Sequence, residues 1–302
     1  MHPALSIIVF TTASGLGYGL AAVLGLGLLD PLSWSTKIAH MLSLLLIGGG
    51  LISSTLHLGN PQRAWRALSQ WRSSWLSREG VMALITFVPL TVNAVAVIFL
   101  DRHLVWAGLA GTALAAITVY CTAMIYASLK AIDAWHTPLT PACYLLFAGA
   151  GGALAAALSA AAGEGPWVAL AIAGTVLLVA SWAVKLAWRH RLQRRPRSTP
   201  ETATGLGAIG KVRLFEPPHI NDNYLTSEMG FRIARKHASK LFRIAFGAGL
   251  VLPLLLALVA LFLSAAGAAV LLGLAVLAFG AGVLVERWLF FAEAKHAVMN
   301  YY

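Results

Sequence analysis

The segment STLHLGNPQRAWRALSQWRSSWLSREG, residues 54–80, places acid–base side chains and aromatic rings between two long apolar runs. His57 lies at the end of the first run and Glu79 at the start of the second, so we expect both to face one pocket. An imidazole that titrates near neutrality beside a carboxylate suits a ligand that exchanges protons together with electrons. A quinone headgroup is such a ligand, because two protons accompany its two electrons.

Arginine and tryptophan side chains in the same segment fit this interpretation. Arg63 and Arg66 can stabilise the negative charge of a semiquinone anion. Trp65, Trp71 and Trp75 can form walls for the flat ring, although tryptophan also gathers at membrane interfaces without binding any ligand.

Each member of the proposed acid–base pair also has a structural explanation. A Glu79 in the first helical turn after Ser77 complements the helix dipole. His57 can hydrogen-bond the free carbonyl groups at the end of its helix. The spacing of these residues therefore leaves both a quinone site and a purely structural role open.

The composition indicates that the chain resides in a membrane. Hydrophobic residues make up 59% of its 302 residues and charged residues 11%, and the mean hydropathy is +0.78. These values lie well outside the range of soluble domains. Strand-like alternation is absent, so an α-helical bundle is expected to satisfy the backbone in lipid. We expect one integral membrane domain over residues 1–302 and see no internal repeat.

Eight apolar segments are long enough to cross about 30 Å of hydrocarbon, which takes about 20 helical residues. The sequence predicts an all-α bundle of eight transmembrane helices, at about 4–29, 37–57, 80–100, 104–128, 141–162, 166–188, 242–264 and 267–292. We expect the first span to be retained, because no basic region precedes it and it is too long for the core of a signal peptide.

The 22 Lys and Arg residues are distributed unevenly about these spans. Eight spans put both termini on one side, and nearly all the charge outside the spans falls there: Arg63, Arg66, Arg72, Arg78, Lys130, the basic segment 189–243 and Lys295. The opposite side has only Lys37 and Arg102. Basic loops are retained in the cytoplasm, so we predict that both termini and the 189–240 loop are cytoplasmic. The charge of +11 suits lipid headgroups or an acidic protein, and no nucleic-acid motif is present.

The sequence offers few ligands for a metal cofactor. Cys121 and Cys143 lie in different predicted spans and form no CxxC pattern, so no iron–sulfur cluster is expected in this chain. Haem ligation would need two imidazoles at similar depth on facing helices. The four histidines near span ends leave that alternative open: His40, His57, His103 and His136.

Glu286 and Arg287 form an ionisable pair near the cytoplasmic end of the last predicted span. Charges inside a membrane often mark a functional site, but a mutual ion pair that braces the bundle is an equally good explanation. A small-solute transporter is a further class of function. The absence of detectable inverted repeats and of charges at the bilayer midplane argues against it.

The residues SSTLHLGNPQRAWRA followed by LSREG closely resemble the membrane anchor subunit of dimethyl sulfoxide reductase. The resemblance covers nearly the whole chain, is strongest over residues 52–80 and is weakest over 189–210. The quinol-site His and Glu of that family correspond to His57 and Glu79. The family also keeps charge near Glu286 and Arg287.

The resemblance implies partners and cofactors that the composition does not. Such an anchor binds a quinone, contains no metal and exchanges electrons with a four-cluster iron–sulfur subunit, which contacts a molybdopterin catalytic subunit. Similar anchors serve sulfite-oxidising complexes that face the cytoplasm and reduce quinone. Because the basic face is predicted to be cytoplasmic, we expect that branch, in a bacterial inner membrane. A quinol-oxidising dimethyl sulfoxide reductase anchor is the alternative.

Overall fold

The computed structural model describes residues 4–56, 60–163, 165–194, 199–216 and 237–300. Within these ranges it is α-helical without a β-strand, and eight helical segments are long and apolar enough to cross a membrane. The predicted all-α bundle of eight spans is confirmed. The spans are α1 (Leu5–Gly25), α2 (Trp34–Thr55), α3 (Trp75–Leu100), α4 (Val105–Ala127), α5 (Leu139–Ala162), α6 (Trp167–Arg194), a seventh over Ala238–Ala260, and α11 (Ala265–Ala292).

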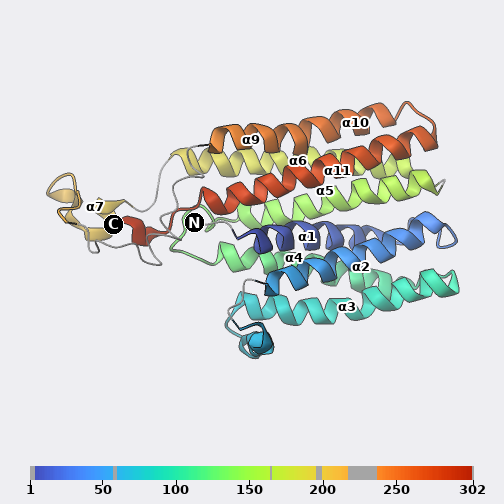
Figure 1. Ribbon diagram of the computed structural model, residues 1–302, viewed down its shortest axis with the longest axis horizontal. Coiled ribbons are helices and arrows are strands. Elements are labelled where there is room, and N and C mark those ends of the chain that lie inside the picture. The colour runs from blue at the N-terminus through green and yellow to red at the C-terminus, as the bar shows by residue number, and fades with distance from the viewer. Residues whose placement is uncertain (1–3, 57–59, 164, 195–198, 217–236, 301–302) are drawn as a thin grey trace.

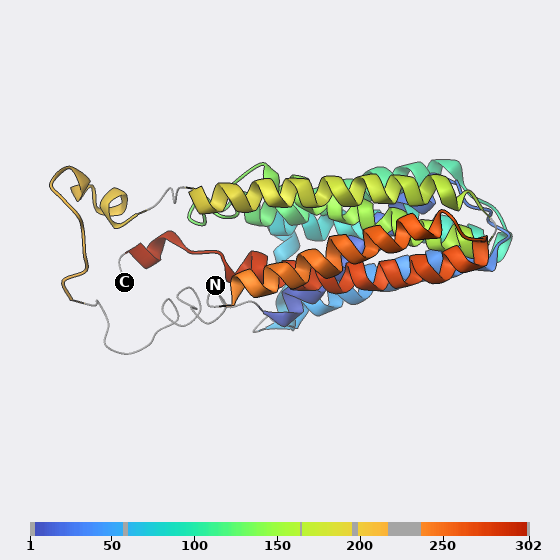
Figure 2. The same ribbon diagram turned by 90° about the horizontal axis from the view of Figure 1, so that it is seen from above.

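Helix α1 lies at the centre of the bundle, where it packs against α2, α4, α5 and α11 (Figure 1). Helix α3 covers α4 on one side. On the other side α5 packs against α6 and α11, and the seventh span packs against α11. All spans run roughly parallel to the long axis of the molecule, as Figure 2 shows from above.

Both chain ends lie at the same end of the bundle, as an even number of spans requires (Figure 1). The same end has the short helices η1 (Pro61–Gln70) and α7 (Pro200–Thr204). The remaining short elements are η2 (Leu206–Ala208) and η5 (Ala297–Asn300). We call this end, which has most of the basic residues, the basic end.

The two largest differences from the predicted helix boundaries are at the start of α3 and the end of α6. Helix α3 begins at Trp75 instead of residue 80, because Ser74 caps it by accepting a hydrogen bond from the Ser77 amide. Glu79 is therefore the fifth residue of the helix, past its first turn. Helix α6 continues to Arg194, so the first part of the expected 189–240 loop is helical. Residues 217–236 of that loop lie outside the described residues.

The seventh span contains a π-helical turn. It runs through α9 (Ala238–Phe246), the π-helix η4 (Gly247–Val251) and α10 (Leu252–Ala260). A π turn shifts the backbone hydrogen bonds by one residue, which leaves carbonyl oxygens for other donors. The buried Trp182 side chain donates from Nε1 to the Gly249 carbonyl oxygen at 2.9 Å. This bond fixes the seventh span against α6.

Small residues let α1 and α5 approach closely. A Cβ atom at Gly152 would overlap the backbone of Gly19, whereas one at Gly149 would meet only the Leu177 side chain, at 3.5 Å. We expect Gly152→Ala to lower the free energy of unfolding by about 1–3 kcal/mol, the usual cost of overpacking. Gly149→Ala should be neutral or stabilising, since Ala is the better helix former by about 1 kcal/mol. Thermal unfolding in detergent compares the two variants, and equal behaviour would contradict the close contact.

Candidate functional site

A pocket of about 530 Å³ opens at the basic end between α1, α2, α3, α4 and η1. Its volume lies in the range of small-molecule sites, and its lining is predominantly apolar. The lining residues are Ile7, Phe10, Leu51, Ser54, Thr55, Ala64, Trp65, Ala67, Leu68, Leu76, Glu79, Gly80, Ala83, Leu84, Ile125 and Tyr126. Among the described lining residues, Glu79 is the single carboxylate.

Glu79 is held in place by α4. Its side chain is 5% exposed, and its Oε1 atom accepts a hydrogen bond from Thr122 Oγ1 at 2.5 Å. Burial of a carboxylate among apolar groups favours the neutral acid, and the hydroxyl contact favours the charged form. A carboxyl group under these two opposing influences is suited to exchanging protons with a ligand.

The helix η1 forms one wall of the pocket at the basic end. The Ser77 hydroxyl donates to the Ala67 carbonyl oxygen, and the Arg78 guanidinium donates to the carbonyl oxygens of Trp71 and Arg72 at 3.0 and 2.7 Å. Gly80 lies against Leu68, where a Cβ atom would come within 2.8 Å of the Leu68 side chain. Helix α3 therefore positions both Glu79 and the η1 wall of the pocket.

The structure brings together only part of the site expected from the sequence. Trp65 and Glu79 both line the pocket, although Trp65 is 67% exposed. Arg63, Arg66 and Trp71 are exposed on and beside η1 and are not among the lining residues. His57 lies outside the described residues, directly after α2, whose last turn contributes Ser54 and Thr55 to the pocket.

A second polar centre lies in the bundle interior. Glu286 and Arg287 form the expected ion pair, with Nη1 3.3 Å from Oε2. Sequence reasoning missed Lys185 of α6, whose Nζ lies 2.6 Å from Glu286 Oε1. A signal was available, because Lys185 is a single cation within the apolar run of α6. Thr122 and Tyr126 were also missed, and nothing in their local sequence distinguishes them from packing residues.

No cluster of three or more His, Cys, Asp or Glu side chains able to hold a metal ion occurs in the part of the chain that the structure describes. Cys121 and Cys143 are buried with free thiols on α4 and α5. His103 lies after α3, and burial lowers its pKa below the ordinary histidine value. The Nδ1 atom of His136 lies 2.6 Å from the Ala127 carbonyl oxygen, a contact that fixes the ring without a metal.

Comparison with known proteins shows which family the chain belongs to. Residues 1–292 match the family model described as DMSO reductase anchor subunit (DmsC). The chain is also 32% identical over 338 aligned residues to a sulfite dehydrogenase subunit of Allochromatium vinosum, and the alignment covers 100% of this chain and 99% of that protein. The chain is therefore a multi-pass membrane protein that belongs to the family of dimethyl sulfoxide reductase anchor subunits.

Proposed function

We propose that this chain is the quinone-binding anchor of a molybdopterin oxidoreductase complex. It exchanges electrons between the quinone pool and a four-cluster iron–sulfur subunit, which contacts the catalytic subunit. One observation supports this above all: the apolar pocket at the basic end contains a buried carboxyl group, Glu79, with a hydroxyl partner. A quinone headgroup needs an apolar slot for its ring and an acid–base group at a carbonyl oxygen.

Different residues of the pocket bind the quinone ring and exchange its protons. A bound quinone takes up two electrons and two protons when it becomes quinol. Glu79 supplies or accepts a proton at one oxygen, and Thr122 holds the Glu79 carboxyl in position. The apolar side chains of α1 and α3, with Trp65 of η1, exclude water from the ring. His57 is proposed as the second acid–base group, from its sequence position after α2.

The exposed arginines of η1 suit a partner surface. Arg63 and Arg66 project outside the pocket at the basic end, as does Arg72 just beyond η1. We propose that the iron–sulfur subunit docks on this end, where its nearest cluster comes within electron-transfer reach of the pocket. Acidic groups on that subunit would then contact these arginines. Such a contact is weakened by salt.

We propose that the complex oxidises sulfite and reduces quinone. The uneven distribution of Lys and Arg predicts that the basic end faces the cytoplasm, which agrees with a cytoplasmic catalytic subunit. The relative from Allochromatium vinosum is named as a sulfite dehydrogenase subunit. An anchor that oxidises quinol for dimethyl sulfoxide reduction is the second candidate, and the family description supports it.

The orientation and the reaction can be tested in one preparation of sealed right-side-out vesicles. An affinity tag on this chain should isolate it together with iron–sulfur and molybdenum subunits. We expect these subunits to resist external protease, and lysed vesicles to oxidise sulfite with a short-chain quinone as acceptor. Digestion of the subunits from outside together with dimethyl sulfoxide reduction would favour the second candidate. Isolation of the chain without any redox partner would favour a transporter.

A further inference from the structure

The buried charges of α6 and α11 do not balance. Lys185, Glu286 and Arg287 are each at most 2% exposed, and both cations contact the same carboxylate. These three side chains have a net charge of +1 in an environment without bulk water. An uncompensated buried charge is strongly unfavourable, so a further negative group is expected nearby.

Neighbouring groups reduce this excess charge but do not neutralise it. Lys185 Nζ lies 3.6 Å from the centre of the Trp188 ring, and the Arg287 guanidinium carbon lies 3.7 Å from that of Tyr144. Ring faces attract cations but carry no net charge. The other buried carboxylate, Glu79, is bonded to Thr122, and no ion pair joins it to either cation within the described ranges.

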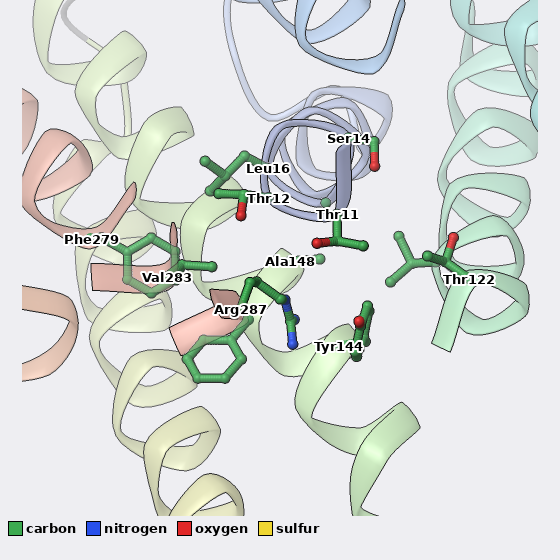
Figure 3. Close-up of a pocket in the computed structure, with 13 residues that line it drawn as sticks. Thr11, Thr12, Ser14, Leu16, Thr122, Tyr144, Ala148, Phe279, Val283 and Arg287 are labelled. Atoms are coloured by element: carbon green, nitrogen blue, oxygen red, sulfur yellow. The ribbon is translucent and has the colours of Figure 1, made fainter. Parts of the chain in front are cut away.

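A small cavity of about 20 Å³ lies next to Arg287, enclosed by α1, α4, α5 and α11. Figure 3 shows the Arg287 guanidinium beside the Tyr144 side chain, and the hydroxyl-bearing residues Thr11 and Thr12 on α1; all four residues line the cavity. Four buried polar atoms of its lining residues have no hydrogen-bond partner among the described residues: Thr12 Oγ1, the Tyr144 hydroxyl, and Arg287 Nε and Nη1, although Nη1 lies 3.3 Å from Glu286 Oε2 in the ion pair. A cavity of this size holds one species about as large as a water molecule.

We propose that this cavity binds a small monovalent anion of the chloride type, held by the Arg287 guanidinium and by the hydroxyl groups of Tyr144 and Thr12. Each of these groups can donate a hydrogen bond to an anion. A water molecule would satisfy the donors but leave the charge of +1. A monovalent anion satisfies the donors and also neutralises that charge. Arg287 excludes a cation, and the volume excludes a carboxylate or phosphate. The bound anion stabilises the bundle next to Thr122, which lines the cavity and bonds Glu79.

Unfolding of the purified full-length chain in detergent tests the proposal. At constant ionic strength, chloride should raise the unfolding temperature above its value in gluconate, and the effect should saturate, because a ligand that binds only the folded state stabilises it by mass action. Bromide should replace chloride, and its anomalous scattering from crystals should place one ion beside Arg287. Identical unfolding in both salts, or no bromide at the cavity, would overturn the proposal.

Two matched variants of α5 separate anion binding from packing. Tyr144→Phe removes a cavity hydroxyl, and Ser159→Ala removes a buried hydroxyl that also lacks a partner but lies outside the cavity. We expect Tyr144→Phe to raise the half-saturating chloride concentration about 10- to 100-fold, the usual value of a hydrogen bond to a charged group. Ser159→Ala should leave it unchanged. If Tyr144→Phe also left it unchanged, the anion site would be refuted, whatever the outcome for quinone binding.

Discussion

Replacing Glu79 by Gln is expected to lower quinone-linked turnover of the complex by about 10²–10⁴-fold, the usual cost of losing a positioned acid–base group. Gln keeps the size of the side chain and its contact with Thr122 but cannot exchange a proton. Turnover with a short-chain quinone measures the effect. Artificial dyes that exchange electrons directly with the iron–sulfur clusters should react at the unaltered rate, because they bypass the pocket. We expect the same pattern for His57→Ala.

A matched control comes from Glu216, which is exposed and is not among the residues that line the pocket. Glu216→Gln makes the same chemical change and should leave both activities intact. If quinone-linked and dye-linked rates fell together in Glu79→Gln, the carboxylate would support assembly of the complex and would have no role in quinone chemistry.

Replacing Glu286 by Ala should lower the free energy of unfolding by about 3–5 kcal/mol, because it leaves two buried cations without their common carboxylate. A loss of this size is a large part of the stability of a typical protein. We expect little folded chain in the membrane and a strongly lowered unfolding temperature in detergent. A variant that also replaces Lys185 and Arg287 by Met should recover much of the loss, since it removes the unpaired charges.

The ion pair of Lys37 with Asp101 at the opposite end of the bundle provides the control. Asp101 is 47% exposed, so its pair is worth at most about 1 kcal/mol. Asn, like Asp, tolerates the left-handed backbone conformation found at position 101, where φ is +54°. Asp101→Asn therefore removes the charge without straining the backbone. If Asp101→Asn lowered the free energy of unfolding as much as Glu286→Ala, burial would not determine how much stability is lost when an ion pair is broken.

The sequence by itself determined the eight spans, because the hydrophobic length of a membrane helix depends on local composition alone. It also selected Glu79, since a carboxylate within an apolar run stands out from its neighbours. The ion pair of Glu286 with Arg287 could also be predicted, because the two opposite charges are neighbours in the sequence. Helix ends were less accurate, as α3 shows, because the Ser74 cap competes with Ser77 for the first turn.

Only the tertiary structure decided which helices complete each site. Thr122 hydrogen-bonds Glu79 although the two residues are 43 positions apart in the sequence. Lys185 and Glu286, which form an ion pair, are about 100 positions apart. Local sequence reveals neither contact, because a threonine or lysine in an apolar helix looks the same whichever face it occupies. The close approach of α1 and α5 at Gly19 and Gly152 also depends on long-range packing. That packing, which no periodic pattern encodes, encloses the cavity beside Arg287 and sets the pocket around Glu79.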